Sequence, residues 1–160
     1  MSRIRITGGE WRSRLVQVPD APGLRPTPDR VRETLFNWLG QDLSGLSCLD
    51  LFAGSGILGF EAASRGADYV ALVERARPAF AALKKHAEGF ACPRLELFCC
   101  DALKFAPPSG RRFDLLFLDP PYGQGWLSRV ESRLDELAAP SARLYAEAEM
   151  PLEKLGRWTV

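Results

Sequence analysis

The tetrapeptide Asp119-Pro120-Pro121-Tyr122 combines residue types whose order points directly to chemistry. It follows the mostly apolar residues 113–118, which predict a buried strand that ends abruptly, because consecutive prolines cannot donate ladder hydrogen bonds. An acid then stands at the end of the strand, with an aromatic ring just beyond it. The Asp119 carboxylate and a backbone carbonyl beside it can accept hydrogen bonds from an exocyclic amine, while the Tyr122 ring stacks on the flat group that carries this amine.

A glycine-rich segment, residues 49–59, predicts a ligand-binding turn between a strand and a helix. Gly54 and Gly56 let the backbone turn tightly and approach a ligand closely. The N-terminus of the helix that follows offers partial positive charge. The run from Gly54 to Gly59 also matches the dinucleotide-binding pattern Gly-x-Gly-x-x-Gly. On this feature alone, NAD and S-adenosylmethionine are both candidate ligands.

Three acids at predicted strand ends favour S-adenosylmethionine. Asp50 precedes the glycines, where its carboxylate can pair with the cationic amino group of a methionine moiety, whereas an NAD pyrophosphate is anionic. Glu74 follows Gly56 by 18 residues, near the spacing expected of an acid that holds ribose hydroxyls. Asp101 can accept a hydrogen bond from an adenine amine. Since ligands of open parallel sheets bind beyond the carboxyl ends of the strands, we predict that these acids meet at one site.

The predicted cofactor is S-adenosyl-L-methionine. The residues predicted to bind it belong to the glycine-rich turn or end the neighbouring strands: Asp50, Phe52, Ala53, Gly54, Ser55, Gly56, Glu74, Arg75, Asp101, Ala102 and Asp119. The predicted catalytic residues are Asp119, Pro120, Pro121 and Tyr122. We expect no metal site, because the four Cys and one His lack the spacing of zinc ligands.

The first 40 residues predict an extension that precedes the main domain. Residues 4–7 and 15–18 read as two short strands joined through a Gly-Gly pair, which predicts a hairpin. Thr27 then predicts a helix N-cap, with Pro28 at the first helical position and Gly40 at the end. Apolar residues recur on one face of this helix, which we expect to pack on the body of the protein: Val31, Leu35, Trp38 and Leu39.

From residue 46 onward, strands alternate with helices, which predicts a mostly parallel sheet. The strands are expected at residues 48–53, 69–74, 95–100, 114–118 and 143–148, and the helices at 57–64, 78–90 and 126–138. The predicted fold class is therefore α/β, a Rossmann-like methyltransferase fold with helices on both faces. We expect one domain over residues 1–160, with the extension at 1–40 and the catalytic core at 41–160.

Composition and charge restrict where the protein acts. Of its 160 residues, 46% are hydrophobic and 26% are charged, and no apolar run is long enough to span a bilayer. The N-terminus lacks the apolar stretch of a secretory signal, so we expect a cytoplasmic protein with free thiols and no membrane contact. The net charge of +1 conceals an asymmetry, because residues 1–40 hold seven Arg and four acids. This excess predicts a local face that contacts phosphates.

Three segments together resemble the RsmD family of bacterial 16S ribosomal RNA guanine-N2 methyltransferases: Arg25 to Phe36, Leu49 to Gly56 and Asp119 to Tyr122. The resemblance runs from about Arg3 to Glu149. Asp-Pro-Pro-Tyr is shared with other amino-methyltransferases of DNA and RNA, whereas the Arg-Pro-Thr helix with its upstream hairpin is more specific. Pro28 replaces the Thr that the family commonly carries, a change compatible with a helix start.

The resemblance implies direct transfer of a methyl group to the N2 amine of a guanine. Hydrogen bonds to the Asp119 carboxylate and the Pro120 carbonyl would orient this amine and stabilise the charge that develops on nitrogen. Tyr122 would stack on the flipped base. The family also usually continues for another strand hairpin beyond the point where this chain stops. The residues from Trp158 to Val160 read as the start of a strand, so the resemblance implies a sheet that lacks one C-terminal strand.

The resemblance further implies that the partner is 16S ribosomal RNA or the assembling small ribosomal subunit, which the protein would meet as a monomer. Arginine side chains can contact RNA phosphates or remain solvated helix charges. The candidate nucleic-acid-binding residues lie around the start of the predicted N-terminal helix: Arg25, Thr27, Arg30 and Arg32.

Other functions stay open at this point. An amino-methyltransferase of another RNA base, a DNA base or a protein amide would use the same motif, although protein amide enzymes usually carry Asn in place of Asp119 and DNA enzymes often need a separate recognition domain. A non-catalytic RNA-binding scaffold with this fold should have lost at least one motif residue. An NAD-dependent oxidoreductase would have no use for Asp-Pro-Pro-Tyr.

Overall fold

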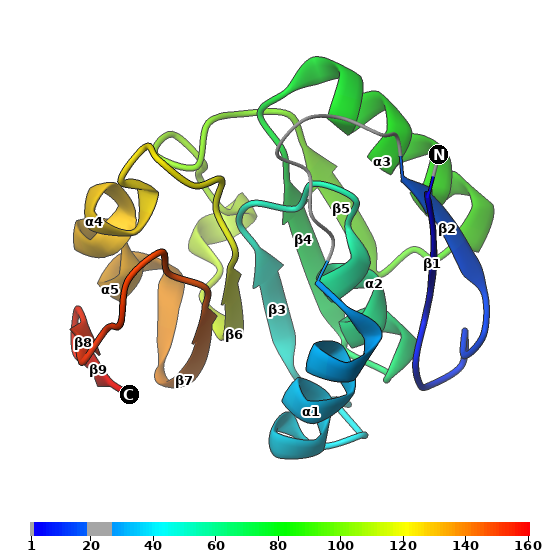
Figure 1. Ribbon diagram of the computed structural model, residues 1–160, viewed down its shortest axis with the longest axis horizontal. Coiled ribbons are helices and arrows are strands. Elements are labelled where there is room, and N and C mark those ends of the chain that lie inside the picture. The colour runs from blue at the N-terminus through cyan, green and yellow to red at the C-terminus, as the bar shows by residue number, and fades with distance from the viewer. Residues whose placement is uncertain (1, 19–26) are drawn as a thin grey trace.

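The computed structural model describes residues 2–18 and 27–160. Within this part of the chain, alternating strands and helices build a parallel sheet in the order β5-β4-β3-β6-β7 (Figure 1). Its five strands are β3 (Ser47–Asp50), β4 (Tyr69–Val73), β5 (Leu95–Phe98), β6 (Phe113–Leu118) and β7 (Ala138–Ala146). The predicted α/β, Rossmann-like fold class is confirmed.

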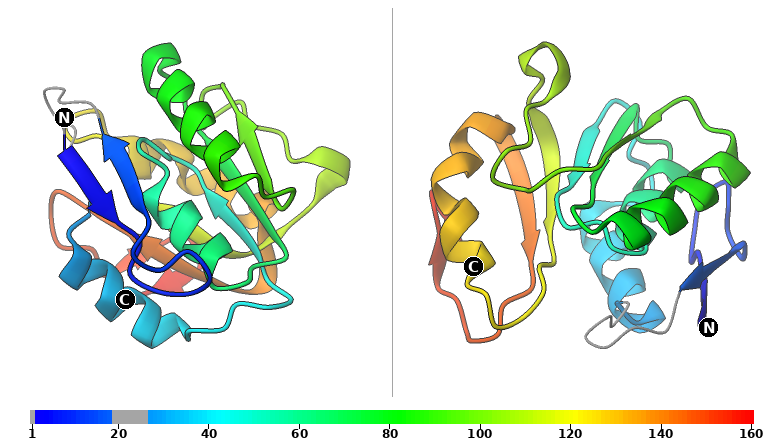
Figure 2. Two further views of the ribbon diagram at one scale, coloured as in Figure 1. Left: turned by 90° about the vertical axis from the view of Figure 1, so that its right-hand side faces the viewer. Right: turned by 90° about the horizontal axis from the view of Figure 1, so that it is seen from above.

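Helices cover both faces of this sheet, as the view from above in Figure 2 shows. One face carries α1 (Asp29–Leu39), α2 (Ile57–Ser64) and α3 (Arg77–Phe90), and the other carries α4 (Trp126–Val130) and α5 (Leu134–Leu137).

Side chains of the central strands alternate between these two layers. In β6, Leu115 and Phe117 join the core beneath α1 and α2, whereas Leu116 and Leu118 join the core beneath α4 and α5. Because both faces are covered, residues 115–118 of the strand form a continuous apolar run rather than an alternating pattern.

The N-terminal hairpin pairs β1 (Ser2–Arg5) with β2 (Leu15–Val18) in antiparallel register. The first strand was expected at residues 4–7 and lies two residues earlier, because the backbone at Thr7 instead bonds to a side chain of α2. Ile4 and Val16 are buried, so the hairpin packs by one face on the α2–α3 layer.

The buried face of α1 differs from the predicted one. Leu35 is buried and Leu39 is half-buried, as expected, but Val31 is 39% exposed and Trp38 is 81% exposed. The buried face carries Arg32 and Phe36 instead. The spacing of the apolar residues predicted the wrong buried face, because the Arg32 side chain is buried by pairing with a carboxylate on another helix.

That partner is Glu61 of α2, whose carboxylate has no solvent exposure. It accepts hydrogen bonds from the Thr7 amide at 3.0 Å and the Thr7 hydroxyl at 2.8 Å. Arg65 Nη1 donates to it at 2.8 Å, and Arg32 Nε lies 3.4 Å away. The Arg65 guanidinium also lies over the Phe36 ring at 4.1 Å from its centroid. One carboxylate thus ties the hairpin, α1 and α2 together.

The C-terminal part deviates from the predicted single helix over residues 126–138. A 3-10 turn, Glu131–Arg133, separates α4 from α5. β7 begins at Ala138, earlier than expected, and shifts register against β6 between Phe113 and Leu115. Lys154–Leu155 (β8) and Trp158–Thr159 (β9) form a two-stranded antiparallel pair, so the expected last strand finds its partner in the preceding segment.

Three negative expectations concern the described residues. All four cysteines, of which Cys48 is buried, are free thiols. Within residues 2–18 and 27–160, no His, Cys, Asp and Glu side chains group in a way that could hold a metal ion. In the same part of the chain, no helix is long and apolar enough to cross a membrane.

Candidate active site

The parallel sheet brings the predicted strand-end acids to one edge. β3, β4 and β6 run in the same direction and are neighbours, so Asp50, Glu74 and Asp119 leave the sheet on the same side. β5 ends at Phe98, so Asp101 stands in the loop that follows rather than at the strand end itself. Asp50, Glu74 and Asp119 lie at strand ends as predicted, whereas Asp101 lies beyond its strand, and the roles of all four toward a cofactor stay predictions.

The glycine-rich turn takes the backbone shape that the sequence indicates. Gly54 has φ of 54° and Gly56 has φ of 84°, both in the left-handed region that favours glycine. A Cβ on Gly56 would lie 2.3 Å from Leu83 Cδ1, so only glycine fits the approach of α3. The Ala53 amide donates to the Val73 carbonyl at 2.8 Å, which anchors the turn to β4.

Asp50 lies behind this turn and is 2% exposed. Its Oδ2 accepts a hydrogen bond from the Gly59 amide at 3.1 Å. Burial raises the pKa of Asp50 to about 7, because the charged form loses its hydration. A cationic amino group beside this carboxylate would supply the missing counter-charge, so the residues present fit the methionine end of S-adenosylmethionine.

Glu74 closes the same turn from β4. Its Oε1 accepts from the Gly54 amide at 2.9 Å, and its Oε2 accepts from the Ala76 amide at 2.7 Å. Asp101 Oδ1 accepts from the Leu103 amide at 2.8 Å, and Arg75 Nη1 lies 4.0 Å from its other oxygen. Backbone donors therefore hold both carboxylates, and that of Glu74 is bonded directly to the glycine-rich turn.

The remaining predicted cofactor residues surround these groups. Phe52 and Ser55 are half-buried, Ala53 and Ala102 are buried, and the Arg75 side chain is mostly exposed. The Phe52 ring meets the Trp126 ring edge-on at a centroid distance of 5.5 Å, which connects the turn to α4.

The Asp-Pro-Pro-Tyr segment follows β6 directly. Pro120 is buried, while Pro121 is exposed and Tyr122 is 63% exposed. An aromatic side chain this exposed, beside a half-buried carboxylate, can stack on a flat ligand without displacing core residues. The geometry therefore suits the acceptor-plus-stacking role that the sequence predicts.

Asp119 carries an unusual charge environment. Burial raises its pKa to about 8, and a hydrogen bond with Glu147, the charge of Glu147 and the charge of Asp50 act in the same direction. The Thr27 hydroxyl donates to Asp119 Oδ2 at 3.3 Å and opposes this shift. The carboxyl group thus holds a proton more strongly than an exposed aspartate does.

Two residues of this site were missed by the sequence reasoning. Glu147 follows β7 and donates its amide to the Leu118 carbonyl at 2.9 Å, which places it beside the start of the Asp-Pro-Pro-Tyr segment. The Tyr145 hydroxyl donates to Glu147 Oε1 at 2.6 Å. The signal that could have found Glu147 is an acid at the end of the strand next to β6.

The candidate RNA-contacting residues differ in whether their side chains are exposed. Arg30 is exposed, and Arg25 lies outside the described residues. Arg32 is fully buried and bonds to the Arg5 carbonyl at 2.9 Å, so the structure contradicts an RNA contact by its guanidinium.

The predicted role of Thr27 is also wrong. It was expected to cap the helix and to contact nucleic acid, but it is buried. α1 begins at Asp29 with Pro28 as its N-cap and no side-chain cap hydrogen bond. Because the Thr27 hydroxyl faces Asp119, this residue positions the carboxylate instead.

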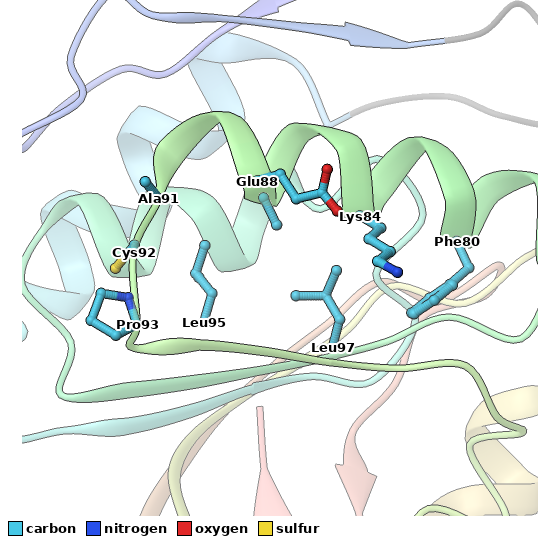
Figure 3. A pocket seen from close by; sticks show the side chains of 9 residues that line it. Phe80, Lys84, Glu88, Ala91, Cys92, Pro93, Leu95 and Leu97 are labelled. Atoms are coloured by element: carbon cyan, nitrogen blue, oxygen red, sulfur yellow. The ribbon is translucent and has the colours of Figure 1, made fainter.

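An apolar groove lies apart from this edge. It runs between α3 and the outer strand β5 and is lined by residues such as Phe80, Leu95 and Leu97 (Figure 3). None of the predicted site residues lines it.

The parallel sheet with helices on both faces is the fold of Rossmann-like methyltransferases. Residues 4–159 match the protein family described as "Conserved hypothetical protein 95". Relatives named "Ribosomal RNA small subunit methyltransferase D" are 42% identical in Escherichia coli K12, over 92% of this chain and 76% of the relative, and 41% identical in Haemophilus influenzae, over 98% and 86%. The chain therefore belongs to the RsmD family of methyltransferases.

Solved structures agree with this assignment. An Escherichia coli chain described as a candidate methyltransferase, YhhF, is 37% identical with a TM-score of 0.82, over 94% of this chain and 86% of that one. A candidate RNA methyltransferase from Pyrococcus horikoshii is 26% identical with a TM-score of 0.59, over 70% of this chain and 57% of that one.

Proposed function

We propose that this protein transfers a methyl group from S-adenosylmethionine to the exocyclic N2 amine of a guanine in the 16S RNA of the small ribosomal subunit. The observation that carries the proposal is the meeting of Asp119 and the glycine-rich turn at one edge of the sheet, in a chain of the RsmD family. Relatives whose names specify small-subunit ribosomal RNA support the substrate class.

Each part of the cofactor has a matching group at this edge. The buried Asp50 suits the cationic amino group, Glu74 suits the ribose hydroxyls and Asp101 suits the adenine amine. When bound, S-adenosylmethionine supplies an electrophilic methyl group on a sulfonium. The chain itself contributes position and charge.

The base is held by the segment after β6. The N2 amine donates to the Asp119 carboxylate and the Pro120 carbonyl, and Tyr122 stacks on the ring. A guanine amine is a weak nucleophile because its lone pair is delocalised, so orientation by fixed acceptors supplies much of the rate. No covalent intermediate with the protein is required.

The substrate would approach across the N-terminal extension. Arg30 is exposed on α1, and the start of this helix is connected to the site through the Thr27–Asp119 hydrogen bond. We propose that Arg30 and Arg25 contact phosphates of the RNA. We expect an enzyme that acts on ribosomal RNA to work in the cytoplasm.

The experiment is methyl transfer from labelled S-adenosylmethionine to small-subunit particles and RNA that lack native modifications, followed by nucleoside analysis. Wild type should form N2-methylguanosine in 16S RNA, and Asp119→Ala should not. A different methylated nucleoside would contradict the substrate assignment. Transfer that is unchanged in Asp119→Ala would contradict the assigned site.

A further inference from the structure

Three hydrogen bonds fix Glu147 beside the predicted catalytic segment, and two of them go to Leu118 and Asp119. Its amide bonds to the Leu118 carbonyl, which fixes the backbone one residue before Asp119. Its carboxylate hydrogen-bonds to the Asp119 carboxyl group, and its Oε1 accepts from the Tyr145 hydroxyl at 2.6 Å. Both Asp119 and Glu147 are half-buried, so neither residue is fully covered by the protein.

The pair has more acceptors than donors. Neither Asp119 nor Glu147 forms an ion pair with a Lys or Arg of the described chain. The groups that face them are the Asp50 carboxylate from β3, the Thr27 hydroxyl that precedes α1, and the Tyr145 hydroxyl from β7. Two adjacent carboxylates are favourable only when a proton or other donors lie between them or along their open edge. This part of the site is therefore built to receive hydrogen-bond donors.

Guanine differs from adenine and cytosine in how many adjacent hydrogen-bond donors it presents. Beside its N2 amine it carries N1–H, so its Watson–Crick edge presents a row of donors. In adenine and cytosine, the ring nitrogen beside the exocyclic amine is an acceptor. Two neighbouring carboxyl groups can accept both donors of guanine. In adenine or cytosine, the lone pair of the ring nitrogen would face one of the negative charges.

We propose that Glu147 is the residue that selects guanine: its carboxylate accepts the N1–H while Asp119 accepts from the N2 amine. Tyr145 is a positioning residue, because its hydroxyl donates to Glu147 Oε1 and so fixes the orientation of the carboxylate. This assignment rests on the proposed function and deepens it, since Asp119 alone would accept an amine from any of the three bases.

The test compares guanine with 2,6-diaminopurine, which keeps the N2 amine but has an acceptor at N1. Small-subunit particles are reassembled with either base at the methylated position, and methyl transfer is measured for wild type, Glu147→Gln and Glu136→Gln. Glu136 is exposed on α5, and its carboxylate pairs with Arg133 and not with Asp119 or Glu147, which makes it a matched control.

Wild type and the control should prefer guanine by roughly 10- to 100-fold, the range expected of one hydrogen bond to a charged acceptor. In Glu147→Gln the ratio should fall toward one, because an amide can accept from N1–H or donate to an unprotonated N1. A ratio that is the same in Glu147→Gln and wild type would overturn the role of Glu147.

Two further readouts keep the result separate from folding and from the proposed function. Melting temperatures show whether Glu147→Gln folds as the wild type does. Ligand-observed NMR of guanosine monophosphate and its diaminopurine analogue, with S-adenosylhomocysteine present, measures the same preference without turnover. Wild type that forms no N2-methylguanine would contradict the proposed function. N2-methylguanine formation with an unaltered preference in Glu147→Gln would contradict the further inference alone.

Discussion

Two clusters of ionisable groups in this protein differ in how their charge is balanced. Glu61 is fully buried between Arg32 and Arg65 and accepts bonds from Thr7, so its negative charge is paired. Asp119 faces Glu147 and feels the charge of Asp50, and none of these three acids pairs with a Lys or Arg of the described residues.

The difference separates stability from function. A buried charge with paired partners holds three elements in place, and removing one partner leaves the others uncompensated. Adjacent acids without a counter-charge cost stability in the free protein and become favourable when a ligand brings cations or donors. We therefore expect the Glu61 cluster to stabilise the fold and the Asp119 cluster to bind and orient the substrates.

Removing Glu61 should give the largest effect on the fold. Glu61→Ala removes the buried carboxylate that Arg32 and Arg65 share, so the free energy of unfolding should fall by about 3–5 kcal/mol. Urea unfolding at pH 7 measures this change. Glu33→Ala, on the exposed side of α1, is the control and should change it by no more than about 0.5 kcal/mol. A loss below about 1 kcal/mol in Glu61→Ala would show that the cluster is not the anchor of the hairpin.

Removing Asp119 should give the largest effect on the reaction. Asp119→Ala deletes a fixed acceptor for the reacting amine, and methyl transfer should fall by about 10²- to 10³-fold. Initial rates with saturating cofactor measure the change, and Asp135→Ala, exposed on α5, serves as the control. A decrease of less than about fivefold would place the reacting amine elsewhere.

The Asp119 cluster also predicts how the free energy of unfolding depends on pH. Burial raises the pKa of Asp119 from 3.8 to about 8 and that of Asp50 to about 7, so the folded protein binds these protons more tightly than the unfolded chain. The free energy of unfolding should therefore fall as pH rises from about 4 to about 8, because the folded protein then loses the protons that it binds more tightly than the unfolded chain does.

Chemical unfolding at several pH values in this window measures the slope. Asp119→Ala should make the curve flatter, because one of the two titrating groups is absent. If wild type and Asp119→Ala follow the same curve, Asp119 does not hold its proton in the folded state.

The smallest expected effect concerns Thr27. Thr27→Val removes a hydroxyl of nearly the same size, and with it the hydrogen bond that opposes the raised pKa of Asp119. Methyl transfer at pH 7 should fall by about 2- to 10-fold, and the pH dependence of the rate should move upward. Thr34→Val is the control, since its hydroxyl donates to the Arg30 carbonyl on the exposed side of α1. Identical pH profiles for both variants would remove Thr27 from the site.

The two clusters also differ in how far the sequence predicts them. The strand-end acids follow from alternation of strands and helices, because a parallel sheet necessarily brings the ends of β3, β4 and β6 to one edge. Glu147 was not found, because the last strand was expected to run to residue 148, whereas β7 ends at Ala146 and leaves Glu147 beside the site.

The Glu61 cluster could not be predicted from local pattern. Arg32 and Trp38 look like exposed and buried residues, respectively, and the structure reverses both. The reversal depends on a carboxylate 29 residues farther along the chain, which periodicity within one helix cannot reveal. The Thr27 hydroxyl was likewise predicted to cap the helix that follows it, although it donates to Asp119, which directly follows β6.

The most direct test measures stability and reaction on the same preparations of wild type and Asp119→Ala at pH 8. We predict that the free energy of unfolding of Asp119→Ala equals or exceeds that of wild type, while methyl transfer falls at least about 100-fold. If Asp119→Ala loses stability, and its unfolded fraction accounts for the lost activity, the assignment of the Asp119 cluster to catalysis is contradicted.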